Sequence, residues 1–363
     1  CAFSELLYTE EACTHPAAHP DNRGLMSITR AATLIRLAVF LVVALAAGQP
    51  AATAQETTPE GSRAIIGRLV EHLFNMGEYT AVDEILSPEY VNHGYGSDDL
   101  TREAFVESLE LLRAAMPDFQ AEIEVLIVEE TWAASRLRFK GTFTNPWVFD
   151  STTTVEPNGE PIEWTLNVLH RIEDGRIIED FAAYDRLGLL IQLDASPLPP
   201  LISALLQTGS ADPIEMEEAS AEGMEAGHLD AFSHVINDAL NAGDLSAIDT
   251  YMAEDYLTHE PFGNFTREQF KGVVEALRSI VPDLVVEIDA TVAEGDWLAA
   301  RLIYLGTFSN PIEIGPITVP ATNKPIRLII NVFVHFNTDG IGFEDFKEYN
   351  RLGWLIQAGL LEG

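Results

Sequence analysis

Two stretches of 13 residues share seven residues in register, and at one of the positions where they differ the first has a residue that can carry out acid–base chemistry. Residues 182–194 read AAYDRLGLLIQLD and residues 347–359 read KEYNRLGWLIQAG, so that Asp185 in the first stretch is replaced by Asn350 in the second. The carboxyl group of Asp185 can take a proton from a carbon beside a carbonyl group and return it without a metal. The amide of Asn350 has no titratable proton and cannot do so.

The same aspartate has a purely structural interpretation. It directly precedes RLGLLIQL, for which a short helix is predicted, and Asp and Asn are almost interchangeable as helix N-caps. Both interpretations remain open for Asp185, whereas capping alone is favoured for Asn350. If Asp185 is only a cap, Asp185→Asn is expected to cost at most roughly a few tenths of a kcal/mol. Glu348 lies on the same predicted strand face as Asn350, where the first stretch has Ala183, and is a candidate for a relocated carboxylate.

Further candidates for contact with a ligand are polar and aromatic residues at repeat positions or in predicted strands. A lone His is more often a hydrogen-bonded core residue than a base, an Asn in an apolar strand can simply bridge strands, and a strand Trp is usually core. These candidates are Asn92, His93, Trp147, Trp164, Asn167, Tyr184, His259 and Asn331. The sequence has no spacing typical of a metal site, a phosphate-binding loop or a Ser-His-Asp site, so we expect no metal and no other cofactor.

The candidate residues are carried by two copies of one domain. FNMGEYTAVDEILSPEYVNH aligns with LNAGDLSAIDTYMAEDYLTH, and KGTFTNP aligns with LGTFSNP. The sequence therefore predicts domain 1 at residues 55–195 and domain 2 at residues 228–363. Residues 196–227, rich in Pro, Ala and Glu, are predicted to be a linker with a helical turn at 201–207.

Each copy is predicted to begin with helices and to end with strands. Thr58 is a predicted N-cap, Gly77 a predicted helix end, and a short helix is expected over residues 80–86. Thr101 is expected to cap a third helix that Pro117 stops. After it the apolar period changes to two, which predicts an antiparallel meander and an α+β fold. A curved sheet around helices leaves a pocket, where small ligands bind.

Both copies resemble the SnoaL-like group of the nuclear transport factor 2-like superfamily, which includes polyketide and ester cyclases. The resemblance covers each repeat and rests on the order and spacing of four stretches: NMGEYTAVDEILSPEYVNH, LRAAMPDFQAEIEVLIVE, GTFTN and DGRIIEDFAAYDRLGLLIQL. It implies a cone-shaped domain of curved sheet and three helices that commonly dimerises through its sheet. The two copies are accordingly expected to form an intrachain pseudo-dimer.

The resemblance also implies a role for the aspartate. In the cyclases that the sequence resembles, an Asp at the end of the last strand is a general acid/base inside the cone, and this position matches Asp185 and Asn350. Burial at the mouth of an apolar cone would raise the pKa of the Asp185 carboxyl group toward the working pH. The family often has His where this chain has Phe143 and Phe308. This departure removes one possible polar contact and weakens the inference that the protein is a cyclase.

The front of the chain predicts export. Residues 26–54 contain two arginines, an apolar stretch and a small-residue end, which is typical of a secretory signal cleaved near Ala54-Gln55. The apolar stretch is too short for a membrane span, so we expect a secreted or periplasmic protein without a membrane anchor. Residues 1–25 are expected to be an upstream or non-native extension. They contain both cysteines, Cys1 and Cys13, so the exported chain is expected to lack thiols.

The composition narrows the classes of partner. The chain has 57 acidic and 21 basic residues, a net charge of −36, and such a surface repels nucleic acid and anionic lipids. Two functions remain. The first is an exported cofactor-free cyclase, isomerase or hydrolase with domain 1 active. The second is a non-catalytic protein or pseudo-dimeric scaffold whose cones bind a small apolar molecule of the carbonyl type.

Overall fold

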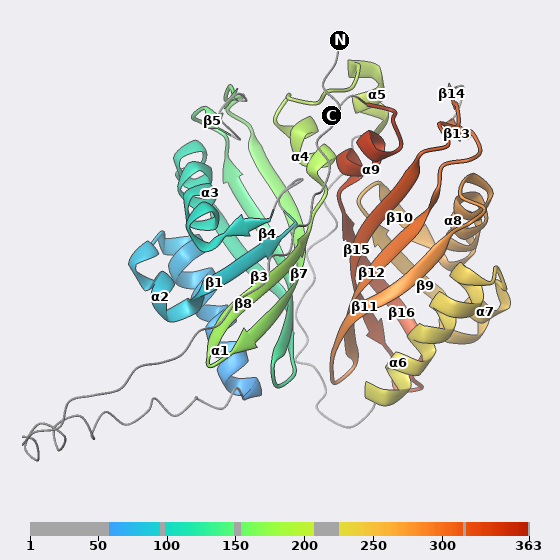
Figure 1. Ribbon diagram of the computed structural model, residues 1–363, viewed down its shortest axis with the longest axis horizontal. Coiled ribbons are helices and arrows are strands. Elements are labelled where there is room, and N and C mark those ends of the chain that lie inside the picture. The colour runs from blue at the N-terminus through green and yellow to red at the C-terminus, as the bar shows by residue number, and fades with distance from the viewer. Residues whose placement is uncertain (1–57, 95–98, 149–153, 207–224, 315–316, 362–363) are drawn as a thin grey trace, which may run out of the picture. The chain divides into compact units, whose positions relative to one another are not determined.

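The computed structural model describes residues 58–94, 99–148, 154–206, 225–314 and 317–361. Within them the chain forms two six-stranded sheets, each with its own helices, so the predicted α+β class and the tandem arrangement are confirmed (Figure 1). The expected signal and the extension before it lie outside the described residues, and export stays a prediction. No helix in the described ranges has the length and hydropathy needed to span a membrane.

The helices of domain 1 begin and end where local signals predict. Helix α1 (Pro59–Arg68) is capped by the Thr58 hydroxyl, which accepts a hydrogen bond from Gly61 N, and it continues as a π-helical segment (Leu69–Met76) that ends at Gly77. Gly77 has a φ of 67°, a left-handed conformation that glycine adopts without strain. A 3₁₀ turn (Tyr79–Ala81) and α2 (Val82–Ile85) follow, and Thr101 caps α3 (Arg102–Ala115).

The sheet of domain 1 has the order β2-β1-β8-β7-β4-β3. Its strands are β1 (Leu86–His93), β2 (Leu100–Thr101), β3 (Gln120–Val128), β4 (Trp132–Thr142), β7 (Pro161–Glu173) and β8 (Arg176–Ala183). The meander from β3 to β8 is antiparallel, as predicted, but β1 was not predicted and pairs parallel to β8. Its sequence, LSPEYVNH, contains a proline, and its apolar and polar residues do not alternate regularly. The pattern therefore did not predict a strand. A small hairpin, β5 (Trp147–Val148) with β6 (Thr154–Val155), lies outside this sheet.

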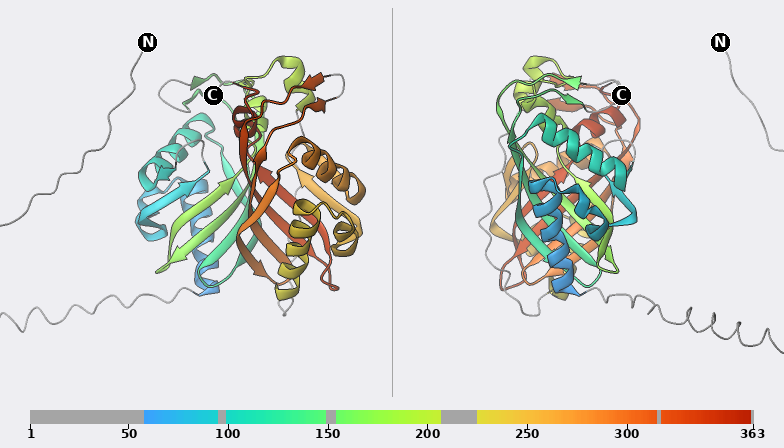
Figure 2. Two further views of the ribbon diagram at one scale, coloured as in Figure 1. Left: turned by 45° about the vertical axis from the view of Figure 1, so that its right-hand side comes forward. Right: turned by 90° about the vertical axis from the view of Figure 1, so that its left-hand side faces the viewer.

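Domain 2 repeats this plan. Figure 1 and Figure 2 show that, in each domain, the helices that precede the antiparallel meander lie on one face of the curved sheet. The helices that precede the meander in domain 2 are α6 (Glu225–His234), a π-helical segment (Val235–Asn241), α7 (Ser246–Tyr251) and α8 (Arg267–Ile280). The sheet comprises β9 (Met252–Glu260), β10 (Gly263–Thr266), β11 (Val285–Glu294), β12 (Trp297–Thr307), β15 (Pro325–Phe336) and β16 (Gly342–Tyr349), and β13 (Ile312–Ile314) pairs with β14 (Ile317–Val319).

Each last strand leads into a short helix, α4 (Arg186–Gln192) in domain 1 and α9 (Arg351–Gln357) in domain 2. The helical turn expected in the linker is α5 (Pro200–Leu206). Helix α6 begins at Glu225, before the expected start of domain 2 at residue 228. Residues 207–224 lie outside the described part, so the exact domain boundaries stay predictions.

The two sheets pack against each other through the faces that their own helices do not cover. An apolar cluster joins strands of both sheets, and its buried members are Val125, Ile127, Ala134, Leu169, Val292, Trp297, Ala299, Phe333 and Phe346. Each sheet is therefore buried on both faces, one against the helices of its own domain and the other against the second sheet.

Charged groups lie within this contact between the sheets. Arg136 is 1% exposed, and its guanidinium lies 3.0 Å from Glu124 Oε2 and 3.3 Å from Glu348 Oε1 of domain 2. It also donates to Asn167 Oδ1 over 2.9 Å and lies over the Phe346 ring. Buried charges of this kind persist only when they are paired, so this cluster holds the two sheets in a specific relative position.

Candidate functional site

The cavity of domain 1 lies between α3, α4 and the sheet. It has a volume of about 490 Å³, within the range of about 300–1,000 Å³ that is usual for small-molecule sites. Its walls are mostly apolar and include Leu109, Phe139, Trp147, Trp164, Leu166 and Leu189. Trp147, Trp164 and Tyr184, which were expected to contact a ligand, all line it.

Polar groups in this cavity are few. They belong to Glu107 and Ser108 of α3, to Tyr184 at the end of β8 and to Arg186 of α4. Burial raises the pKa of the Tyr184 hydroxyl, and the positive charge of Arg186 opposes this rise. Tyr184 is therefore a neutral hydrogen-bonding group at neutral pH, and it lies beside a cation.

Asp185 does not line this cavity. Its Oδ2 atom accepts a hydrogen bond from Gly188 N over 2.9 Å, which is the expected cap of α4, and also pairs with Arg351 of domain 2. A separate cavity of about 60 Å³ between the domains lies beside Asp185, and it shares Trp164 and Leu189 with the larger one. Burial raises the pKa of the Asp185 carboxyl group, although Arg351 opposes the rise. This carboxylate therefore lies beside the large cavity and not among its lining residues, and the predicted cap of α4 is confirmed.

The Arg351 pair changes the expected effect of Asp185→Asn. An asparagine keeps the cap but leaves the guanidinium of Arg351, which is 7% exposed, without a carboxylate. We expect a loss of about 1.5–3 kcal/mol in the free energy of unfolding, because a hydrogen bond to a charged group is removed. Urea denaturation measures this loss. Asn350→Ala, which removes the cap of α9 alone, provides the comparison at about 0.5–2 kcal/mol. A change of only a few tenths for Asp185→Asn would mean that the ion pair adds nothing.

The two polar residues near the end of β16 do not enter the cone of domain 2. Asn350 Oδ1 accepts from Gly353 N over 2.9 Å, so Asn350 caps α9. Glu348 reaches into the contact between the sheets, where it binds Arg136 and Thr165 of domain 1. Burial raises the pKa of Glu348 to about 7, against the charge of Arg136. The hypothesis that Glu348 replaces the aspartate inside the second cone is therefore wrong.

Asn167 and Asn331 join the two sheets. Asn167 Nδ2 donates to the backbone oxygens of Asn331 and Phe346, and Asn331 Nδ2 donates to those of Asn167 and Phe181, all over 2.7–2.9 Å. These residues point away from the cones, because strand alternation places them on the opposite face from Leu166 and Val168, which belong to the domain 1 core. The structure gives them an interface role in place of ligand binding, close to the alternative that they bridge strands.

The two repeated histidines also lie on the outer face of their sheets. His93 stacks on Phe181 and its Nδ1 atom lies 2.8 Å from Asp99, whereas His259 stacks on Phe346 and its Nε2 atom lies 2.8 Å from Glu344. Neither lines the cavity of domain 1. His259 contributes instead to the small cavity between the domains.

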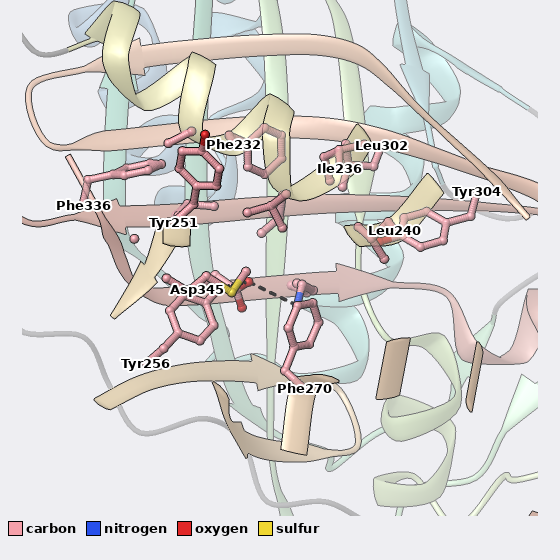
Figure 3. A pocket seen from close by; sticks show the side chains of 17 residues that line it. Phe232, Ile236, Leu240, Tyr251, Tyr256, Phe270, Leu302, Tyr304, Phe336 and Asp345 are labelled. Atoms are coloured by element: carbon pink, nitrogen blue, oxygen red, sulfur yellow. Dashed lines mark hydrogen bonds and ion pairs between the residues drawn. The ribbon is translucent and has the colours of Figure 1, made fainter. Parts of the chain in front are cut away.

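The interior of domain 2 is more closely filled. Its cavity holds about 30 Å³, the share of liquid volume that one water molecule occupies. Figure 3 shows Tyr256, Asp345 and Phe270 around it, and the dashed line from Asp345 marks its ion pair with Lys347. Burial opposes the charge of Lys347, but Asp345 and Glu260 outweigh it and raise the pKa of the ammonium group. Where α4 has Leu189, α9 has the larger Trp354, which packs against this core.

Comparisons with known proteins agree with the repeat. The family model for SnoaL-like polyketide cyclases matches residues 64–193 and residues 232–357. The chain belongs to the SnoaL-like polyketide cyclase family. Both domains are therefore SnoaL-like domains, as the resemblance predicted. The comparison with curated proteins finds no match.

Solved structures similar to this chain each match about one SnoaL-like domain. TsrD from Streptomyces laurentii is 24% identical, with 40% of this chain and 100% of that chain covered and a TM-score of 0.34. IdmH from Streptomyces antibioticus is 23% identical over 36% of this chain and 98% of that chain, with a TM-score of 0.32. A SnoaL-like polyketide cyclase from Agrobacterium tumefaciens is 17% identical over 35% and 93%, with a TM-score of 0.29.

One polar chain inside the first SnoaL-like domain escaped the sequence analysis. Ser135 Oγ lies 2.8 Å from His170 Nε2, His170 Nδ1 lies 2.6 Å from Asp180 Oδ1, and Tyr90 donates to Asp180 Oδ2 over 2.7 Å. Asn92 extends the chain by donating to Tyr90 Oη. The sequence has no spacing typical of a Ser-His-Asp site, because these three residues come together only when their strands pair. None of these residues lines the 490 Å³ cavity, and all are almost fully buried, so the chain has no room for a substrate at Ser135.

Proposed function

We propose that the first SnoaL-like domain binds a small, largely apolar molecule in its cavity, and that the second domain is its structural partner. The observation that carries this proposal is the contrast between a cavity of about 490 Å³ in domain 1 and one of about 30 Å³ in domain 2. The apolar walls of the larger cavity supply most of the binding energy, and its few polar groups orient the ligand.

Introducing the tryptophan of domain 2 at the equivalent position of domain 1 tests this proposal. Leu189→Trp introduces at α4 the side chain that α9 carries at Trp354, and it is expected to occupy part of the domain 1 cavity. Binding of 2-naphthamide, a neutral aromatic probe, is expected to weaken at least about tenfold, since a tenfold change needs only about 1.4 kcal/mol. Isothermal titration calorimetry gives the affinity.

The reverse change, Trp354→Leu, is the matched control and should leave the affinity of domain 1 for 2-naphthamide unchanged. The proposal fails if the unaltered protein binds neither this probe nor its carboxylate analogue, 2-naphthoate, or if Leu189→Trp binds 2-naphthamide as well as the unaltered protein does. It also fails if Trp354→Leu has the larger effect, because the ligand would then lie in domain 2.

Acid–base chemistry at Asp185 is the second candidate function. The observation that favours it is that Asp185 Oδ1 is buried without a hydrogen-bond partner in the described part of the chain, in a small cavity that adjoins the large one. A movement of Trp164 or Leu189, which line both cavities, would let a carbonyl compound bound in the large cavity approach this oxygen. Exchange of the α-protons of 2-tetralone in D₂O, followed by NMR, tests this candidate. Asp185→Asn should abolish the exchange; persistent exchange in this variant would exclude Asp185 as the base.

A further inference from the structure

Arg186 is an unusual wall residue for the domain 1 cavity. It lies at the start of α4, and its side chain has no ion-pair or hydrogen-bond partner among the described residues, with Nε buried and unpaired. The residue is partly exposed, but its buried Nε–H group has no acceptor among the described residues, and an unsatisfied buried donor is costly. A ligand group of the opposite charge would remove this cost.

The contact between the domains explains why Arg186 is unpaired. The residue at the equivalent repeat position is Arg351, and it pairs with Asp185 of the other domain. By the twofold relation of the repeats, Arg186 would pair with residue 350, which is Asn350 and not Asp. Asn350 Oδ1 accepts from Gly353 N, and no hydrogen bond joins Asn350 to the Arg186 side chain among the described residues. The ion pair between residues 186 and 350, which would match the pair between Arg351 and Asp185, is therefore absent.

We propose that the loss of the carboxylate at position 350 leaves Arg186 to bind an anion, and that the ligand of domain 1 is an aromatic or alicyclic carboxylate. This inference rests on the proposed function, because it names the ligand class of the same cavity. The planar guanidinium can donate two parallel hydrogen bonds to a carboxylate, and the hydroxyl group of Tyr184 lies on the same wall. The Trp147 and Trp164 rings provide the surface for the apolar body.

The charge of the rest of the protein means that a preference for an anionic over a neutral ligand would point to a local cation. The whole chain carries a net charge of −36, and Glu107 lies on the cavity wall, so both act against the binding of an anion. A cavity without a specific cation would therefore prefer a neutral ligand over its anionic equivalent. A preference for the anion can come only from a local group such as Arg186.

The experiment compares 2-naphthoate with 2-naphthamide, which have nearly the same shape and differ in charge. Calorimetry at pH 7.5 and low salt is expected to show that the unaltered protein binds 2-naphthoate about tenfold more tightly than 2-naphthamide, as expected for a charge-assisted hydrogen bond. Arg186→Gln should remove this preference, because glutamine carries no charge that favours the carboxylate over the amide. Asn350→Asp should do the same, because it supplies the missing carboxylate partner for Arg186.

Arg176→Gln is the matched control, since Arg176 is exposed at the start of β8 and the charge change is the same. It should keep the preference for 2-naphthoate. Equal affinities for the two probes in the unaltered protein, or a preference that survives Arg186→Gln, would overturn the inference while 2-naphthamide binding still supports the cavity. Absence of binding by both probes would overturn the proposed function as well.

Discussion

Replacing Arg136 by methionine is expected to lower the free energy of unfolding by about 3–5 kcal/mol, because it leaves the buried carboxylate of Glu348 without its cation and leaves Glu124 with Arg138 alone. Glu124 and Glu348 both lie within hydrogen-bonding or ion-pair distance of this guanidinium, and both are almost fully buried. Urea denaturation at pH 8, where Glu348 is mostly ionised, gives the full effect. The loss should be smaller at pH 5, where Glu348 can take up a proton.

The repeat supplies a matched control at Arg301. This residue occupies the equivalent position in β12 and lies over the Phe181 ring, but its partner Asp289 has a side chain that is 41% exposed. After Arg301→Met, Asp289 can return to water, so the loss should be clearly smaller than for Arg136→Met. Equal losses in the two variants would show that packing of the arginine side chains, and not the buried charges, accounts for the effect.

Raising the pH from 5 to 8 is expected to cost about 2–3 kcal/mol of stability through Glu348, on the basis of about 1.4 kcal/mol per pKa unit. Burial raises the pKa of Glu348 in the folded protein from 4.5 to about 7. Between these values the folded protein keeps the proton and the unfolded chain has lost it, so stability falls as the pH rises. The comparison of urea denaturation at the two pH values measures this contribution.

Glu348→Gln isolates the contribution, because glutamine fills the same space and does not titrate. The variant should lack this share of the pH dependence, whereas Glu254→Gln, at an exposed position of β9, should retain it. If Glu348→Gln keeps the full pH dependence, other groups of the protein cause it. The raised pKa of Asp185 contributes in the same direction and is removed separately by Asp185→Asn.

Local features of the fold could be predicted because their causes lie within a few residues. Thr58 and Thr101 each cap a helix with a hydroxyl that accepts from a backbone N–H three residues ahead, and Asp174-Gly175 forms the expected turn with both residues at positive φ. The repeat itself was visible as an aligned sequence. These signals need no knowledge of the rest of the chain.

The position of site residues could not be predicted as well, because both faces of each sheet are buried. A period of two shows that Leu166 and Val168 share one face and that Asn167 lies on the other, but it does not say which face is the cone. Apolar residues on both faces removed the usual distinction between core and solvent. The candidate ligand contacts Asn167, Asn331 and Glu348 therefore lie between the two sheets and not inside a cone, and for the two asparagines this is close to the bridging role left open by the sequence.

Contacts between distant strands were also beyond the sequence. Ser135, His170 and Asp180 meet only because β4, β7 and β8 pair in one particular register. The partner of Asp185 lies 166 residues away in the other domain. Arg186 could not be predicted as a site residue either, because its lack of a partner depends on position 350, which is distant in the sequence and has no carboxylate.

The joining of both sheets within one chain has a consequence for how the protein responds to concentration. Two separate subunits dissociate when they are diluted below the dissociation constant of their complex. Here the linker keeps the partner sheet at a high effective concentration that dilution does not change. The apolar cluster and the Asn167–Asn331 hydrogen bonds should therefore persist in solutions where a two-chain assembly of the same domains would be mostly dissociated.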